Sequence, residues 1–223
     1  MTTVRRLIEL SHPIVDGMLT HPGIPGPTIS TWLTHAASAE RYAEGTTFEI
    51  GRIDLVANTG TYVDTPAHRF VGGQDLEDFP LERLVDLDGL LVDATGIDGK
   101  AIDQQIFNGL ELEGRAVLIR TGWDVHWATD TYLADNPYLT KAAAEALLAA
   151  GAALVGIDSL NIDSLADPHR PAHSALLQGG VPIVEHLTGL EALPVKGWRF
   201  FAPPPRIRGM ATFPIRAFAI VDE

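Results

Sequence analysis

The sequence predicts a single α/β domain, residues 1–223, with a substantial sheet or barrel and few helices. Short apolar runs that end at glycine recur along the chain, which is typical of buried strands. One alanine-rich segment has the composition of a helix, and no repeat, low-complexity run or linker divides the chain. A chain of 223 residues is long enough to bury one complete hydrophobic core.

The first quarter of the chain is predicted to combine a loop with strand-forming residues. Residues 11–30 are rich in proline and glycine, which indicates an irregular loop. Residues 46–58 place apolar side chains at alternate positions, as a strand does. The phase of this alternation shifts at Gly51 and Arg52, so we expect a bulge or kink there.

The middle of the chain contains two predicted strands and the clearest helix. Residues 89–96 and 115–122 are short apolar runs closed by glycine, which favours buried strands. Residues 141–150 are rich in alanine and form the predicted helix. Thr140 can accept hydrogen bonds from the first free amides of this helix, and Gly151 is suited to end it.

The remaining elements are predicted from shorter patterns. Residues 152–157 form a strand after the helix, and residues 174–180 form a short helix. Two further strands are expected, at residues 181–187 and at residues 212–222.

Composition excludes several classes of function. The chain has 29 acidic against 16 basic residues and a net charge of −13, which opposes binding to nucleic acid or an anionic membrane. It contains no cysteine, which excludes disulfides and cysteine-ligated zinc and fits a reducing cytoplasm. No apolar run approaches the ~18 residues of a membrane span. We therefore expect a cytoplasmic protein whose partner is a small-molecule substrate.

One segment gathers several side chains that can bind metals or transfer protons. In "NTGTYVDTPAH", residues 58–68, alternate positions of an extended chain share one face, so the polar residues Asn58, Tyr62, Asp64 and His68 point the same way. Aspartate and histidine are common ligands of divalent ions, and histidine is a common general base. A structural interpretation stays open, in which Asp64 caps a turn and His68 is a packed polar residue.

A second segment, residues 169–187, contains further candidates. Glu185 lies among apolar residues, and a buried carboxylate needs a cation, hydrogen bonds or a proton. His173 is expected at the start of the short helix, so both residues are candidate metal ligands. A purely structural hydrogen bond remains the alternative for Glu185. His169 and His186 flank these residues, and we expect them at the surface or in supporting positions.

The four residues Asp64, His68, His173 and Glu185 supply two carboxylates and two imidazoles, a set that suits zinc or manganese with an open position for water. No nucleophile elbow, phosphate-binding loop or dinucleotide fingerprint is present. Outside this set, Trp32 is a candidate for a lid over a pocket, together with the proline-rich loop before it. Three arginines are expected to pair with acidic residues or to lie in a subunit interface: Arg206, Arg208 and Arg216.

At these residues the chain resembles the cyclase family of metal-dependent hydrolases, which includes bacterial kynurenine formamidases and isatin hydrolases. The family signature is H-x-G-T-H-x-D-x-P-x-H, and the chain has "NTGTYVDTPAH" in its place. Asn58 and Tyr62 therefore replace two histidines of the signature. The resemblance extends over almost the whole chain, including "LSHPIVDGM", "LIRTGWD", "HSALLQGGVPIVEHL" and "PPRIRGMATFPIRAFAI".

The resemblance implies a swivelling β/β/α fold with a barrel-like core and peripheral helices. It also implies a homodimer or homotetramer with the sites near subunit contacts. Asp64, His173 and Glu185 are the implied metal ligands, with Asn58 as a weak additional one, and His68 is the implied general acid/base. An amide oxygen or a neutral phenol binds zinc weakly, so the first metal position of the family should have lost most of its affinity.

We therefore expect a hydrolase of carbon–nitrogen bonds other than peptide bonds, using one zinc or manganese ion. Its substrate would be a small N-acyl amide, a cyclic amide or a lactone. Tyr62 is expected to donate a hydrogen bond to the developing oxyanion. The alternative is a divergent member with little or no metal, either a small-molecule binding protein or a lyase or isomerase that uses Tyr62 and His68.

Overall fold

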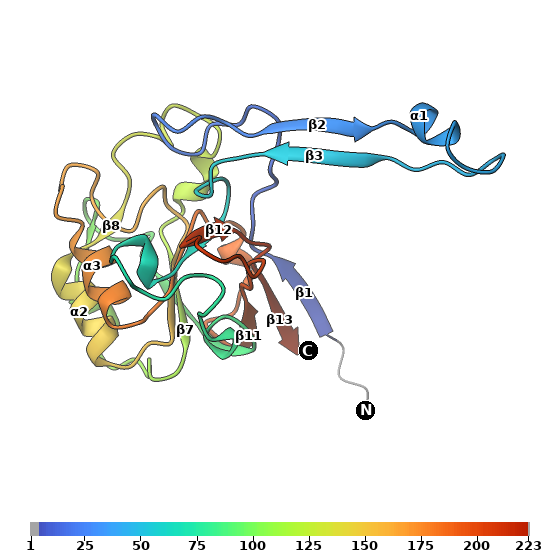
Figure 1. Ribbon diagram of the computed structural model, residues 1–223. Coiled ribbons are helices and arrows are strands. Elements are labelled where there is room, and N and C mark those ends of the chain that lie inside the picture. The colour runs from blue at the N-terminus through green and yellow to red at the C-terminus, as the bar shows by residue number, and fades with distance from the viewer. Residues whose placement is uncertain (1–4, 223) are drawn as a thin grey trace.

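The computed structural model describes residues 5–222, which fold around a nine-stranded sheet (Figure 1). The strands are β1 (Arg5–Glu9), β2 (Thr28–Leu33), β3 (Ile50–Asp54), β4 (Tyr62–Asp64), β5 (Leu87–Asp93), β6 (Ala101–Ile102), β7 (Ala116–Arg120), β8 (Tyr138–Leu139), β9 (Leu154–Ile157), β10 (Ile183–Glu185), β11 (Lys196–Phe201), β12 (Thr212–Pro214) and β13 (Phe218–Asp222). The α-helices are α1 (His35–Ala39), α2 (Lys141–Ala149) and α3 (Pro171–Gln178), and 3-10 turns cover Pro66–His68, Leu81–Arg83, Gln104–Phe107, Trp123–His126 and Leu190–Ala192.

The large sheet is curled into a half-barrel. Its strand order is β1-β13-β11-β5-β7-β9-β10-β4-β12, so β13 and β12 lie near opposite ends. Only three residues separate these two strands in the chain, and such a link spans at most ~14 Å. In a flat sheet seven strand spacings would separate them by roughly 34 Å. The sheet must therefore curl until its two ends approach each other, which confirms the predicted α/β fold with a barrel-like core.

Both faces of the central strands are buried, which explains why these segments are continuously apolar. Along β7, Leu118 packs into the cluster inside the half-barrel, with Trp198 and Phe200. Its neighbours Val117 and Ile119 point the other way, into a second cluster between the sheet and the helices α2 and α3. The two cores follow directly from the alternation of side chains along a strand.

The elements predicted in the middle of the chain are confirmed. The hydroxyl of Thr140 accepts from the amide of Ala143 at the start of α2, and Gly151 follows the end of this helix with φ 77°. Strands β7, β9 and β10 lie within the predicted segments. Strand β5 begins two residues before its predicted segment, and α3 begins at Pro171, three residues before the expected start. The predicted strand at residues 212–222 is divided into β12 and β13, which serve opposite ends of the sheet.

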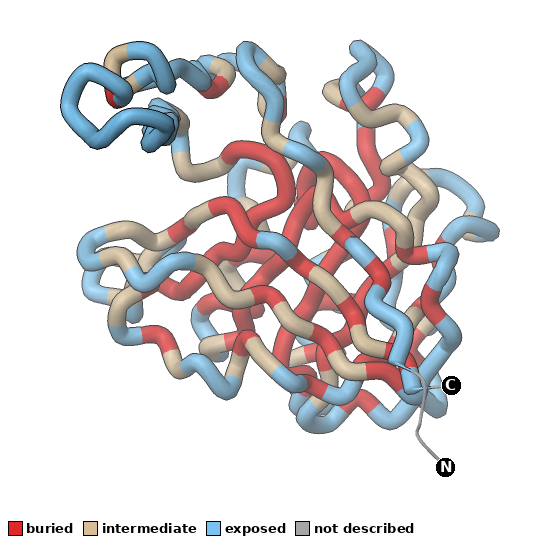
Figure 2. Tube along the Cα trace, turned by 90° about the vertical axis from the view of Figure 1, so that its right-hand side faces the viewer, coloured by how far each residue is buried: buried red, intermediate tan, exposed pale blue. Residues whose placement is uncertain are grey.

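A hairpin of β2 and β3 projects from the body of the domain, with α1 between its strands (Figure 1). We call residues 28–54 the arm. The register of the hairpin shifts between Thr31 and Leu33, which pair with Gly51 and Ile50. The irregularity therefore lies in β2 and not at the predicted step from Gly51 to Arg52, whose residues pair regularly. Nearly all residues of both strands are exposed, and the arm runs as a pale-blue extension of the buried body (Figure 2). Within residues 5–222, no helix is long and apolar enough to cross a membrane.

Candidate metal centre and active site

The pairing of β4 with its two neighbours brings several polar side chains together. Tyr62 lies opposite Glu185 on β10, and Asp64 lies opposite Thr212 on β12. Residues directly opposite each other in a sheet project from the same face, so these four side chains emerge on one side. The 3-10 turn that follows β4 then places His68 beside Asp64, with its Nδ1 3.4 Å from the Asp64 Oδ1.

His173 reaches the same place from the first turn of α3. Asp163 caps this helix from the loop that leads into it, since its carboxylate accepts from the amides of Ala172 at 2.6 Å and His173 at 3.1 Å. The same carboxylate lies 2.7 Å from Nδ1 of His173. This contact directs Nε2 of His173 towards the sheet, where it lies 3.6 Å from Asp64 Oδ2 and 3.7 Å from Glu185 Oε1.

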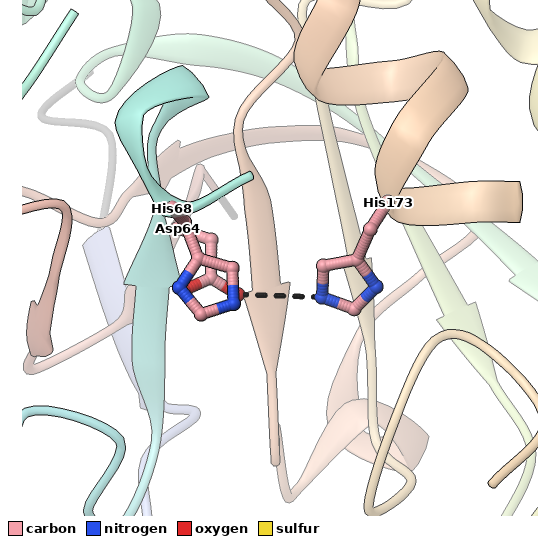
Figure 3. A group of neighbouring side chains, drawn as sticks. All are labelled: Asp64, His68 and His173. Carbon is pink, nitrogen blue, oxygen red and sulfur yellow. Dashed lines mark ion pairs between the residues drawn. The ribbon is translucent and has the colours of Figure 1, made fainter. Parts of the chain in front are cut away.

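The structure thus brings Asp64, His68 and His173 into one cluster, with a potential ligand atom from each within 4.8 Å of the others (Figure 3). Asp64 and His68 lie together on one side of the cluster and His173 approaches from the other side, with an ion pair joining the carboxylate of Asp64 to His173 (Figure 3). Asp64 and His173 are buried, whereas His68 is partly exposed. The Asp64 Oδ2 atom is buried and has no hydrogen-bond partner.

The charged side chains of this cluster shift one another's pKa values. Burial alone would raise the pKa of Asp64, but the neighbouring His173 and His68 outweigh it and hold this pKa below its ordinary value. Burial would likewise lower the pKa of His173, yet the carboxylates of Glu185, Asp163 and Asp64 raise it to about 9. The pocket therefore favours positive charge next to Asp64.

A divalent ion fits this environment. Ligand bonds of ~2.1 Å in tetrahedral geometry separate the ligand atoms by roughly 3.4 Å, close to the two distances of 3.6 and 3.7 Å around His173 Nε2. An unpartnered buried carboxylate oxygen is costly unless a cation or donor meets it. The carboxylate of Asp163 contacts the other ring nitrogen of His173. Metal-binding histidines usually have such a hydrogen-bond partner on the nitrogen that does not bind the metal.

Three residues predicted at the site, Asn58, Tyr62 and Glu185, are engaged with one another. The Tyr62 hydroxyl donates to Glu185 Oε2 at 2.5 Å and is itself hydrogen-bonded by the Asn58 side chain. The other oxygen of Glu185 accepts from the amide of Ile162 at 2.7 Å. Burial and the charges of Glu185 and Asp64 raise the pKa of Tyr62 well above its ordinary value. To donate to a substrate oxygen, as predicted, Tyr62 would have to release Glu185.

A second group of buried polar side chains lies against Tyr62. The ring of His186 is 5.1 Å from that of Tyr62, and its Nδ1 lies 2.8 Å from the Tyr132 hydroxyl. His186 is fully buried with φ 58°, so the expectation of a surface position was wrong, although a supporting position fits. The ring of His12 stacks on Trp127 at 3.8 Å. The Nε2 atoms of both histidines are buried without a hydrogen-bond partner.

A cavity of about 350 Å³ lies beside this second group, between the proline-rich loop and the segment after β7. Its apolar lining includes Val15, Met18, Leu19 and Trp127. The proline-rich loop therefore lines a pocket, whereas Trp32 lies on the arm and is 70% exposed.

Sequence patterns did not reveal several residues of the site. Asp163 contacts His173 from the loop that leads into α3, and Thr212 contacts Asp64 across a strand pair, but the residue patterns of their own segments do not point to these contacts. His12 belongs to the segment that resembles the family, but nothing in its spacing points to Trp127. The predicted pairing of arginines with acidic residues is confirmed for Arg208 with Glu77 and for Arg216 with Glu9.

The sequence and the fold are similar to those of several known proteins. Residues 8–164 match the profile of the cyclase family ("Putative cyclase"). Kynurenine formamidase of Salinibacter ruber is 30% identical over 221 residues, which cover 95% of each chain. Kynurenine formamidase of Bacillus cytotoxicus is 26% identical, covering 94% of this chain and 95% of the relative.

Solved structures show the same fold. A potential metal-dependent hydrolase with cyclase activity superposes with a TM-score of 0.80 at 27% identity, covering 99% of this chain and 100% of its own. Isatin hydrolase A from Ralstonia solanacearum gives a TM-score of 0.82 at 22% identity over 97% of this chain and 92% of its own. Formamidases and isatin hydrolases are, by name, hydrolases of carbon–nitrogen bonds. The chain belongs to the cyclase family.

Proposed function

We propose that the protein is a metal-dependent hydrolase that cleaves the carbon–nitrogen bond of a small N-acyl or cyclic amide, with a small lactone as a related substrate. The observation that carries this proposal is the buried Oδ2 atom of Asp64, which lacks a hydrogen-bond partner and lies 3.6 Å from the Nε2 of His173. The names of the related formamidases and isatin hydrolases support the reaction class.

The metal would be held by Asp64 and His173, with Glu185 completing the set. When bound, a zinc or manganese ion would lower the pKa of a water molecule and polarise the substrate carbonyl. Glu185 contributes the oxygen that faces His173, while its other oxygen stays with Tyr62. Asn58 contributes through Tyr62 rather than as a direct ligand.

His68 is the proposed proton carrier. It is the one partly exposed member of the cluster, and it lies within reach of Asp64. Such a position lets the imidazole take the proton from the attacking water and then deliver it to the leaving nitrogen. Asp64 stabilises the imidazolium that forms between these two steps.

A metal-independent function for Tyr62 and His68 has less support. The Tyr62 hydroxyl is buried and committed to Glu185, and its raised pKa makes it a poor proton donor or acceptor at neutral pH.

The experiment combines metal analysis with a hydrolysis assay on untagged protein purified without chelator. We expect about one zinc or manganese ion per chain, and turnover of a formyl-aromatic amide such as formanilide. Asp64→Asn and His173→Ala should lose the ion. His68→Ala should keep it but lose about 10²- to 10⁴-fold in kcat, and the exposed control His169→Ala should resemble the native protein.

The proposal has clear ways to fail. Native protein that takes up only a few per cent of an ion after zinc or manganese is added would overturn it. If His68→Ala instead loses the ion together with the activity, His68 is a ligand and not the proton carrier.

A further inference from the structure

Thr212 connects the candidate ligand Asp64 to the proposed proton carrier His68. It lies on β12 directly opposite Asp64 and is only 3% exposed. Its hydroxyl donates to Oδ1 of Asp64 and lies 2.9 Å from Nδ1 of His68. One buried hydroxyl therefore contacts both residues at once.

The direction of these two hydrogen bonds follows from the atoms involved. A threonine hydroxyl has a single proton, and an ionised carboxylate can only accept. The Thr212 hydroxyl thus donates its proton to Asp64, and the hydroxyl oxygen must accept a hydrogen bond from Nδ1 of His68. His68 then has a proton on Nδ1, and in the neutral ring its Nε2 has a free lone pair. The Nε2 side of the ring faces the space between Asp64 and His173 (Figure 3).

We propose that Thr212 is a positioning residue that fixes His68 with its proton on Nδ1 and the lone pair of Nε2 directed into the site. The catalytic consequence rests on the proposed hydrolase function, in which Nε2 must accept a proton from water. Without the Thr212 hydroxyl, Nδ1 of His68 loses its 2.9 Å acceptor and keeps only the longer contact of 3.4 Å with Oδ1 of Asp64. The form preferred by histidine in water, with the proton on Nε2, then becomes accessible. That form presents a donor where the reaction needs an acceptor.

Three variants separate this role from a general loss of packing. Thr212→Val removes the hydroxyl and keeps the shape, whereas Thr212→Ser keeps the hydroxyl. Thr65→Val is the matched control, because the hydroxyl of Thr65 is also buried and donates to the carbonyl of Ala211 at 2.8 Å. Thr65 is the residue directly after Asp64 at the end of β4. Its hydroxyl donates to the backbone of Ala211, next to β12, and does not contact the side chains of the site.

The first readout is independent of activity. Full-length protein labelled with ¹⁵N-histidine, treated with chelator and held at about pH 8 where ordinary histidine is neutral, reports the protonated ring nitrogen in an NMR spectrum. His68→Gln assigns the signal. We expect the Nδ1–H form in the native protein, Thr212→Ser and Thr65→Val, and the Nε2–H form or a mixture in Thr212→Val.

The second readout is hydrolysis of formanilide by the zinc-loaded proteins, with zinc content measured in parallel. Thr212→Val should lose about 10²-fold in kcat with little change in KM, while Thr212→Ser and Thr65→Val stay near the native rate. The inference is overturned if Thr212→Val keeps the Nδ1–H form, or if Thr65→Val loses as much activity. A tautomer change in protein that hydrolyses nothing supports the positioning role and counts against the hydrolase function.

Discussion

At the scale of single residues, the two departures from the family signature do more than remove imidazoles. Asn58 and Tyr62 form a hydrogen-bonded chain that ends on Glu185, which is buried beside the candidate metal ligands. The carboxylate is thereby satisfied by a hydroxyl and by the amide of Ile162 without any cation. Asn58 and Tyr62 thus help to stabilise the buried carboxylate of Glu185.

His186 should make the protein sensitive to acid. Burial lowers the pKa of His186 to about 3, so it stays neutral in the folded state, whereas in the unfolded chain it gains a proton below about pH 6.5. Its contribution to stability is therefore complete above pH 6.5 and declines as the pH falls towards 3, by about 1.4 kcal/mol per pH unit. His12, with a pKa lowered to about 4, acts in the same direction. His173 adds no dependence of stability on pH below pH 6.5, because it is protonated in both the folded and the unfolded state.

Urea unfolding of chelator-treated protein at pH 6.5 and pH 5 tests this expectation. Between pH 6.5 and pH 5 the free energy of unfolding should fall in both proteins. The decrease in His186→Gln should be about 2 kcal/mol smaller than the decrease in the native protein. Any strain from glutamine at the positive φ of position 186 affects both pH values equally. The exposed control His169→Gln should keep the native slope. A native slope in His186→Gln would contradict the prediction.

The principal residues of the site could be predicted because their chemistry is visible in the sequence. Asp64, His68 and His173 stand in segments with a recognisable pattern, and the structure brings them together. Asp163 and Thr212 could not be found in this way. Thr212 gains its role from strand pairing with a residue 148 positions away in the chain. Asp163 lies only ten residues before His173, but it gains its role from the conformation of the loop that leads into α3, which no local pattern shows.

At the scale of elements, local patterns predicted the central strands well. Strands β7 and β9 are buried on both faces, so their apolar runs are unambiguous. The segment at residues 212–222 was predicted as one strand because apolar residues dominate it. Its division into β12 and β13 is decided by closure of the sheet, a property of the whole molecule that no local pattern contains.

Gly89 on β5 is required by a close approach of the neighbouring strand. A Cβ at this position would lie 2.0 Å from Cζ3 of the Trp198 ring. The ring cannot move away easily, since it is buried and its Nε1 donates to the carbonyl of Pro194 at 2.8 Å. Gly89→Ala should therefore lower the free energy of unfolding by about 3 kcal/mol, measured by urea denaturation.

Gly96 supplies the matched control for this substitution. It follows β5 in a loop, has no positive φ, and a Cβ there would meet no atom within 4 Å. Gly96→Ala should leave the stability unchanged or raise it by up to about 1 kcal/mol, by restricting the unfolded chain. Equal stabilities of Gly89→Ala and the native protein would show that β5 and β11 can separate without cost.

At the scale of the whole molecule, the arm is the part of the fold whose stability and exposed apolar surface need a further explanation. An isolated two-stranded hairpin is marginally stable in water. The arm nevertheless exposes large apolar side chains, with Trp32 at 70%, Ile53 at 50% and Ile50 at 45%. Exposed apolar surface of this kind indicates a contact with another protein surface. We expect the partner to be a second copy of this chain, in the homodimer or homotetramer implied by the resemblance.

Sedimentation velocity over a range of protein concentrations tests the arm as an assembly element. The native protein should sediment as a dimer or tetramer. The double variant Trp32→Glu with Ile53→Lys should already dissociate at protein concentrations at least about 10-fold higher than those at which the native protein dissociates, because two charges would be buried at the contact. Val71→Lys is the control, since Val71 is fully exposed on the body, outside the arm, and should not alter assembly. A native protein that remains monomeric would leave the apolar arm facing water, and the expected second copy would be wrong.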